Sequence, residues 1–245
     1  GRFRQMMRPG DRMRIVIGLL ALALALFARP AAAGNFSDWG AIVVAGDHRA
    51  HDGGDSEVFD DGRHDIGEAL QRIGFKHDNI VEFSTEPEKY NAPAPLHSDP
   101  GSIASSLWDL SNRTAAGCLV YLTSHGSTDG VVIGDDMLSP LDLSRMLNNS
   151  CGARPTLVVV SACFSGVFIP EIAGPNRFVL TAARADRTSF GCGQADRYTF
   201  FDECFLSSIA AAHDFRDLAI DSRRCLAAGE KKENVSPPSD PQAAI

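Results

Sequence analysis

The chain has 245 residues, of which 44% are hydrophobic and 22% charged, and its formal net charge is −8. This is the composition of a globular protein with one core, and it excludes a fibrous or wholly disordered chain. The acidic balance, with no basic stripe beyond the N-terminus, argues against a nucleic-acid partner because phosphate binding needs clustered lysine and arginine. The sequence does not indicate an oligomeric state.

The first 33 residues have the three parts of a secretory signal peptide. Five arginines between Arg2 and Arg14 precede an apolar run, and Ala31 to Ala33 supply an Ala-x-Ala cleavage site. The run is about 14 residues long, shorter than the roughly 20 of a membrane-spanning helix. We therefore expect residues 1–33 to be removed from a periplasmic or secreted protein that has no stable membrane insertion afterwards. An uncleaved membrane anchor is the alternative.

Short apolar runs then alternate with amphipathic stretches, which predicts one α/β domain over residues 34–228 with helices crossing between parallel strands. Strands are expected at residues 41–45, 80–83, 119–123, 131–133, 157–160 and 177–182. Helices are expected at residues 65–73 and 101–110, from Ser139-Pro140 onward, and finally at residues 198–212. Three prolines predict a loop at residues 90–100. The polar residues 229–245 are expected to form a disordered tail.

Two of the predicted strands end in residues with useful chemistry. Residues 119–126 read LVYLTSHG and end in His125 and Gly126, while residues 157–163 read LVVVSAC and end in Cys163. Ligands bind beyond the carboxyl ends of the strands in an open parallel sheet, so we expect both ends to face one crevice. There a thiolate attacks a carbonyl and an imidazolium supplies the proton to the departing amine. The sequence therefore predicts a catalytic dyad of Cys163 and His125.

Glycines beside the two residues fit the same chemistry. Gly126 lets its backbone N–H approach a substrate oxygen, and with the N–H of Cys163 it predicts an oxyanion hole that contributes roughly 3 kcal/mol to the transition state. Gly166 is expected to relieve crowding in the turn after the nucleophile. A buried structural thiol is the alternative for Cys163, but it leaves His125 and both glycines unexplained.

Three blocks resemble the peptidase C13, or legumain, family of the caspase-like clan. They read TSHGS at residues 123–127, SACFSG at residues 161–166, and TAARADRTS at residues 181–189 with Cys192 following. The blocks have the family's order and spacing, and their combination on successive strands is a specific signal. The resemblance implies a three-layer caspase-like α/β fold with a mostly parallel central sheet flanked by helices. It also implies a cysteine endopeptidase that acts through a thioester acyl-enzyme on a peptide or protein substrate, with no cofactor.

The resemblance further implies a substrate pocket, from which this chain departs in part. Family members carry an acidic residue two positions before the nucleophile, where this chain has Ser161. Ser189 matches a serine of the pocket wall, Asp196 is expected to supply an acidic wall, and Arg49 stands in for the family's early arginine. Cleavage after asparagine is the expectation, with cleavage after aspartate or a basic residue left open.

The chain contains neither His-Glu-x-x-His nor Cys-x-x-Cys, so no metal site is predicted. The acidic and histidine-rich residues 48–64 lack the spacing of a calcium loop and are expected to form a solvated loop on the substrate side. Two further functions stay open besides hydrolysis. One is a transpeptidase or ligase that uses the same dyad, and the other is a non-catalytic binding module that keeps the fold.

Export would place the six cysteines in an oxidising compartment. Cys118 lies inside an apolar run, so we expect it to be a buried and unpaired thiol. If Cys163 must stay free, the remaining cysteines allow three pairing schemes, among which the sequence does not choose. These are Cys151, Cys192, Cys204 and Cys225.

Overall fold

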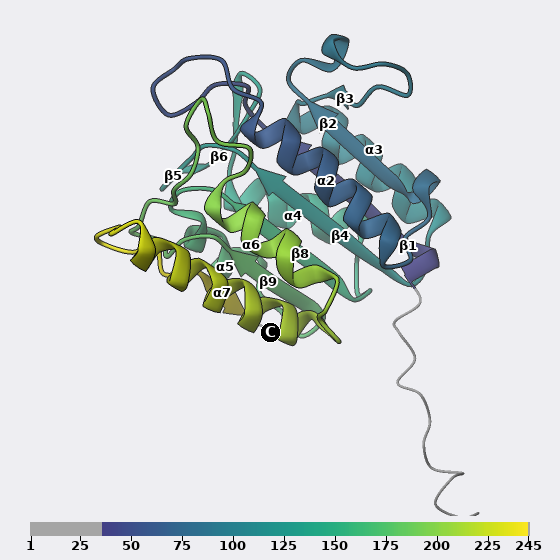
Figure 1. Ribbon diagram of the computed structural model, residues 1–245. Helices are drawn as coiled ribbons and strands as arrows, with labels where there is room; N and C mark the ends of the chain where they lie inside the picture. Colours follow the sequence, from purple (N-terminus) through teal and green to yellow (C-terminus); the bar gives the residue numbers. More distant parts are fainter. Residues whose placement is uncertain (1–35, 245) are drawn as a thin grey trace, which may run out of the picture. The chain divides into compact units, whose positions relative to one another are not determined.

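The computed structural model describes residues 36–244, so the predicted signal peptide lies outside the described residues. Its centre is a seven-stranded sheet with the order β10-β9-β8-β4-β1-β2-β3 (Figure 1). Neighbouring strands are parallel except for β10, which runs antiparallel to β9. The strands of this sheet are β1 (Trp39–Ala45), β2 (Ile80–Ser84), β3 (Leu96–His97), β4 (Gly117–Thr123), β8 (Thr156–Ser161), β9 (Arg177–Thr181) and β10 (Gln242–Ala244). A small antiparallel sheet contains β5 (Gly126–Ser127), β6 (Gly130–Ile133) and β7 (Asp136–Leu138).

Helices cover both faces of the large sheet, with α2, α6 and α7 on one face and α3, α4 and α5 on the other (Figure 1). Their bounds are α2 (Val58–Arg72), α3 (Pro100–Arg113), α4 (Pro140–Ser150), α5 (Ile169–Ile172), α6 (Phe200–Ile209) and α7 (Phe215–Lys232). Short 3₁₀ helices are η1 (Phe36–Asp38), η2 (His77–Asn79), η3 (Pro87–Lys89) and η4 (Ser165–Phe168). This arrangement confirms the predicted three-layer α/β fold class.

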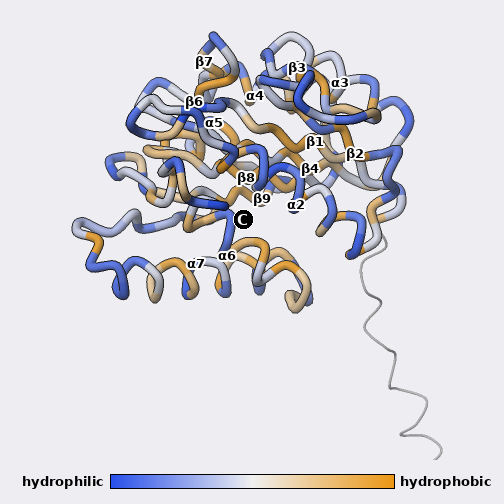
Figure 2. The backbone as a smooth tube through the Cα atoms, turned by 45° about the horizontal axis from the view of Figure 1, so that its top comes forward, coloured by the Kyte–Doolittle hydropathy of each residue, from blue (hydrophilic) through white to orange (hydrophobic). Residues whose placement is uncertain are grey.

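The core follows from the apolar character of the central strands. All seven residues of β4 are buried, as expected for a parallel strand that is covered on both faces. Successive side chains of a strand alternate between the faces. Val120 and Leu122 therefore pack in the cluster that includes α3 and α4, and Leu119 and Tyr121 pack in the cluster that includes α2, α6 and α7. Figure 2 shows the hydrophobic strands at the centre and hydrophilic segments around them.

Side-chain caps fix the starts of four helices. In each case a side-chain oxygen accepts a hydrogen bond from the backbone N–H of the first turn, which satisfies a donor that the helix itself leaves unpaired. The capping residues are Asp99 for α3, Ser139 for α4, Thr199 for α6 and Asp214 for α7. The helix predicted at residues 65–73 begins earlier, at Val58, because Val58 and Phe59 are also buried against the core.

The expectation of a disordered tail from residue 229 is wrong. Helix α7 continues to Lys232, and β10 pairs with the edge of β9. Between them Ser239 is fully buried, and its backbone N–H donates to the buried carboxylate of Glu230 at 3.1 Å. Polar residues become ordered here because their backbone groups find partners on the strand edge and on α7. The domain consequently extends beyond the predicted boundary at residue 228.

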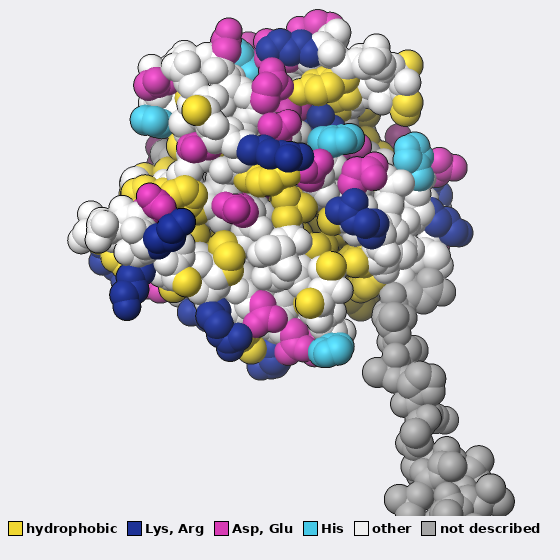
Figure 3. All heavy atoms as spheres, viewed as in Figure 1, with side chains coloured by type: hydrophobic (Ala, Val, Ile, Leu, Met, Phe, Trp, Pro, Cys, Tyr) yellow, Lys and Arg dark blue, Asp and Glu magenta, His cyan; other side chains and the backbone are white. Residues whose placement is uncertain are grey.

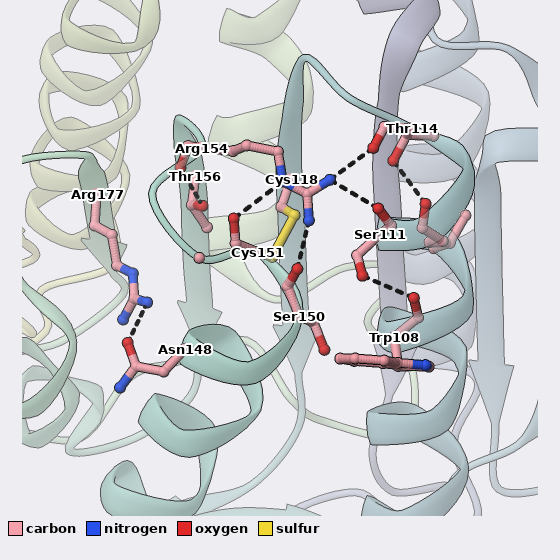
Figure 4. The surroundings of a disulfide bond; sticks show 12 residues. Trp108, Ser111, Thr114, Cys118, Asn148, Ser150, Cys151, Arg154, Thr156 and Arg177 are labelled. Carbon is pink, nitrogen blue, oxygen red and sulfur yellow. Dashed lines mark hydrogen bonds between the residues drawn. A yellow bond between two sulfur atoms is a disulfide. The ribbon is translucent and has the colours of Figure 1, made fainter.

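Cys118 is not an unpaired thiol, because it forms a disulfide with Cys151, as Figure 4 shows. This bond joins the start of β4 to the end of α4. The second disulfide, Cys204–Cys225, joins α6 to α7. Among the described residues Cys163 and Cys192 are the free cysteines. The prediction failed because an apolar neighbourhood indicates burial but does not indicate whether a second thiol is within reach.

Beside the first disulfide, Arg154 connects the ends of two helices (Figure 4). Its guanidinium donates to the carbonyl oxygens of Thr114 at 2.6 Å, Ser111 at 3.0 Å and Cys151 at 3.0 Å, and also to that of Ser150. These carbonyls lie at the C-termini of α3 and α4, which present unpaired acceptors. One cation therefore caps both helices.

The surface is mixed in charge on the face that Figure 3 shows, where acidic and basic side chains are interspersed with hydrophobic ones. Within residues 36–244 none of the helices is both long enough and apolar enough to span a membrane.

Candidate active site

The register between β4 and β8 brings the two predicted dyad positions to one edge of the sheet. Thr123 and Ser161 are paired across these parallel strands, and the N–H of Ser124 donates to the carbonyl of Ser161 at 3.1 Å. His125 follows Thr123 by two residues, and Cys163 follows Ser161 by two residues. Both residues therefore leave the sheet side by side at the carboxyl ends of neighbouring strands, where α/β proteins bind ligands.

His125 is held by two contacts. Its Nε2 lies 2.8 Å from the carbonyl oxygen of Arg49, and its ring meets the ring of Phe59 edge-on with centroids 5.0 Å apart. A carbonyl oxygen accepts but cannot donate, so Nε2 carries the proton in this hydrogen bond. The other ring nitrogen, Nδ1, is then the basic one, and the carbonyl fixes this tautomer.

The partly exposed Cys163 lies against the loop that follows β9. The backbone N–H of Ser189 donates to its Sγ at 3.3 Å, and the carbonyl and hydroxyl oxygens of Ser189 lie 3.6 Å from the same atom. The next residue, Phe164, has a φ of 57°, and its N–H donates to the carbonyl of Arg187 at 2.7 Å. A bulky residue in this left-handed conformation turns the chain sharply after Cys163 and costs about 1–3 kcal/mol.

Two glycines allow close backbone approaches at this turn. A Cβ on Gly126 would lie 2.4 Å from the carbonyl oxygen of Cys163, so the segment after His125 packs directly on the backbone of Cys163. A Cβ on Gly166 would lie 2.5 Å from the backbone nitrogen of Ala185. Only glycine fits at either position without a shift of main-chain atoms. The expectation that Gly166 relieves crowding after Cys163 is confirmed.

Asp47 shapes the segment that supports His125. It is buried, and its carboxylate accepts hydrogen bonds from the backbone N–H of Arg49 at 3.0 Å and from the Arg49 guanidinium at 2.9 Å. Burial raises the pKa of Asp47, but the hydrogen bonds from Arg49 outweigh this effect and hold that pKa below its ordinary value. The side chain of Arg49, expected to contact substrate, is therefore paired with Asp47 and half exposed, while its carbonyl contacts His125.

The histidine-rich and acidic segment after β1 packs against the loop that carries Cys192. His51 donates its N–H to the carbonyl of Cys192 at 3.0 Å, Ser56 donates its hydroxyl to the carbonyl of Gly193 at 3.3 Å, and Gln194 donates to the carboxylate of Asp52 at 2.9 Å. These two loops form a joint rim beside His125. Within residues 36–244 no group of three or more His, Cys, Asp or Glu side chains is arranged to hold a metal ion.

One of the expected pocket residues, Ser161, lies differently from the prediction. Ser161 is 1% exposed, and its hydroxyl lies 3.2 Å from that of Thr199, so it faces the interior and does not line the site. Because side chains alternate along β8, it points to the face of the sheet that α2, α6 and α7 cover. Asp196 is exposed, and its carboxylate accepts a hydrogen bond from the N–H of Gly193 at 2.7 Å. Ser189, by contrast, is in direct contact with Cys163.

The second free cysteine was not among the predicted site residues. Cys192 packs beside Val58 and Phe59 at the rim. Burial and the neighbouring Cys163 raise the pKa of the Cys192 thiol to about 11, so it stays protonated at neutral pH.

Comparison with known protein families decides the relationship. The model of the peptidase C13 family matches residues 91–224, which is more than half of the chain and includes His125, Cys163 and Ser189. The chain belongs to the peptidase C13 family. The fold is similar to that in the crystal structure of caspase-1 from Spodoptera frugiperda, with a TM-score of 0.61, 15% sequence identity, and coverage of 86% of this chain and 87% of that chain. No curated protein sequence matches the chain.

Membership of the C13 family indicates a cysteine peptidase. The likeness to caspase-1, at this level of identity, concerns the fold. Peptide or protein substrates follow from the peptidase family.

Proposed function

We propose that this chain is a cysteine endopeptidase in which Cys163 is the nucleophile and His125 the acid and base. The observation that supports this assignment is the pairing of Thr123 with Ser161, which puts the two residues at adjacent strand ends while the Arg49 carbonyl holds His125 by Nε2. Nδ1 is then the nitrogen that accepts the proton of the Cys163 thiol.

In this proposal Nδ1 of His125 takes the proton of the Cys163 thiol, and the thiolate attacks the scissile carbonyl carbon. The C–N bond then breaks, and the imidazolium returns the proton to the departing amine, which leaves a thioester on Cys163. His125 next takes a proton from water, and the hydroxide cleaves the thioester to release the carboxylic acid and restore the thiol. The N–H groups of Gly126 and Cys163 stabilise the oxyanion of the tetrahedral intermediates.

For the pocket we propose that Ser189 contributes to one wall, since it touches Cys163, and that Arg49 and Asp196 contribute from the rim. Cleavage after asparagine is the specificity we propose, with aspartate and basic residues as the competing outcomes. We also propose that the protein is exported, because a chain that keeps two disulfides suits an oxidising compartment.

A digest of a positional peptide library, with cleavage sites located by mass spectrometry, tests activity and specificity together. The wild-type protein should cleave, whereas Cys163→Ala and His125→Ala should lose cleavage while they keep the wild-type circular dichroism spectrum. A thiol alkylator should inactivate the enzyme with its adduct on Cys163. Cleavage that survives in folded Cys163→Ala refutes the assignment, and amide products formed with an added amine would favour a transpeptidase over a hydrolase.

A further inference from the structure

A buried carboxylate lies beneath the two strand ends that carry Cys163 and His125. Asp202, in the first turn of α6, has no exposed surface. The hydroxyl of Tyr121 donates to its Oδ1 at 2.6 Å, and the hydroxyl of Thr123 donates to its Oδ2 at 2.6 Å. Both donors belong to β4, whose last residue is Thr123. A single side chain of α6 therefore holds the carboxyl end of β4.

The same cluster reaches the end of β8. The hydroxyl of Thr199 accepts the backbone N–H of Asp202 at 3.0 Å and lies 3.2 Å from the hydroxyl of Ser161. The hydroxyls of Ser161 and Thr199 lower the pKa of the Asp202 carboxyl, as the hydroxyls from β4 do. Because Thr123 and Ser161 are register partners, the cluster spans the two strand ends at one level, two residues before each of the proposed catalytic residues.

Burying the Asp202 carboxylate costs more free energy than a purely structural contact requires. Burial raises the pKa of Asp202, and the hydrogen bonds from Thr123 and Tyr121 offset this in part. Within residues 36–244 no lysine, arginine or histidine pairs with this carboxylate, whose side-chain partners are hydroxyls. Well-packed apolar side chains would bury the same volume without a desolvation penalty. A polar cluster in this place, unlike apolar packing, sets the orientation of the groups that it joins.

The cluster also connects to the third segment of the site. Thr199 caps α6 and ends the loop that begins near Ser189, and Ser189 contacts the sulfur of Cys163. The N–H of Phe200 donates to the carbonyl of Phe190 at 3.1 Å, which ties the start of α6 to the residue after Ser189. The ends of β4 and β8 and the Ser189 loop thus meet at one carboxylate.

We propose that Asp202 is a positioning residue: through Thr123, Ser161 and Thr199 it fixes the relative placement of His125, Cys163 and Ser189. This inference rests on the proposed function and deepens it. Asp202 is sealed from solvent and touches no substrate, so it acts on catalysis through the strand ends. A displacement of about 1 Å between reacting groups lowers a rate by about 100-fold, and substrate binding at the rim is affected far less.

The test is the variant Asp202→Asn, which keeps the shape of the side chain but puts an NH₂ group in front of one hydroxyl donor. We expect kcat to fall by about 10- to 100-fold with KM changed less than about threefold. Alkylation of Cys163 by iodoacetamide should slow in the folded variant as well. Thr123→Val, which removes one donor at nearly constant volume, should lower kcat in the same way but less.

Ile209→Val is the matched control, because it trims α6 in the same core without touching the cluster. Its kcat should stay within about twofold of wild type when the protein is folded. If Asp202→Asn does not fold, Thr123→Val decides the question. A kcat of the folded cluster variants equal to that of wild type, or a loss no larger than that of Ile209→Val, overturns the inference. Absence of cysteine-dependent cleavage in the wild type would instead refute the proposed function, and this inference would fall with it.

Discussion

Removing the Cys118–Cys151 disulfide should destabilise the protein by a predictable amount. The cysteines are 33 residues apart, and the entropy of closing a loop of that length corresponds to about 4 kcal/mol at 25 °C. Both half-cystines are buried and join β4 to the C-terminal end of α4, so they constrain elements of two adjacent layers, the central sheet and the helices packed on it. The double variant Cys118→Ala/Cys151→Ala should lose that stabilisation, while the second disulfide, whose cysteines are 21 residues apart, should contribute about 3 kcal/mol.

Urea unfolding followed by circular dichroism measures the effect. With a slope of about 2.5 kcal/mol per molar urea, the midpoint of the double variant should fall by roughly 1.5 M. The slope itself should rise, because the unfolded chain without the cross-link exposes more surface. Cys192→Ala is the control, since that cysteine closes no loop. A loss below about 1 kcal/mol for the double variant would refute the reasoning, since the disulfide would then not constrain the unfolded chain.

Three further predictions concern single side chains. Arg154→Ala should cost about 3 kcal/mol in urea unfolding because it leaves the C-terminal carbonyls of two helices without their shared donor, and Arg154→Lys should recover only part of the loss. Gly126→Ala should abolish peptide cleavage in a protein that remains folded, because the new Cβ displaces the backbone of Cys163; full activity would contradict the close approach. The pKa of Asp47 in the folded state lies below its unfolded value of about 3.9. Its contribution to the free energy of unfolding should therefore be complete above that pH and disappear as the pH falls through the folded pKa. Thermal unfolding between pH 2 and pH 7 compares Asp47→Asn with wild type. The variant should be less stable near neutral pH and equally stable in acid. A difference in stability that does not change with pH would show that the pairing with Arg49 does not cause it.

The sheet could be predicted from the sequence because its central strands are continuous apolar runs. Residues 41–45, 119–123 and 157–160 are buried on both faces and lie within β1, β4 and β8. The meeting of His125 and Cys163 at the carboxyl ends of two of these strands follows from the rules for parallel α/β sheets. The order of the strands came only from the structure. Periodicity and capping residues also located α3 and α4, to within a few residues at their ends.

The C-terminal part was missed because its order depends on tertiary contacts. Helix α7 is rich in charged residues, and its buried face is thin, with Leu218, Ala219, Ser222 and Leu226 at helical spacing. Strand β10 consists of Gln-Ala-Ala, which has little strand propensity, and it exists because β9 offers an unpaired edge. Strand β10 cannot be recognised without knowing that the edge of β9 is adjacent.

The supporting residues of the site were missed for a related reason. Asp47 and Asp202 are ordinary acidic residues in the sequence, and their burial depends on neighbours 2 to 81 positions away. The acid that the family resemblance led us to seek at position 161 is absent from that position, but a carboxylate reaches the same cluster from α6. Motifs identified the residues that we propose perform the chemistry, while the contacts that hold those residues became visible only in three dimensions.

The state of the six cysteines affects how the enzyme can be handled. Four of them need an oxidising medium to remain bonded, whereas the proposed nucleophile has to stay reduced in the same molecule. A weak reductant at low concentration reduces an accessible sulfenic acid or mixed disulfide back to the thiol. Prolonged treatment with a strong reductant also breaks the two disulfides. Burial raises the pKa of the Cys192 thiol to about 11, so we expect it to react slowly with alkylating reagents near neutral pH. One equivalent of such a reagent should therefore titrate the proposed nucleophile and count the molecules that carry it in reactive form, without any variant being made.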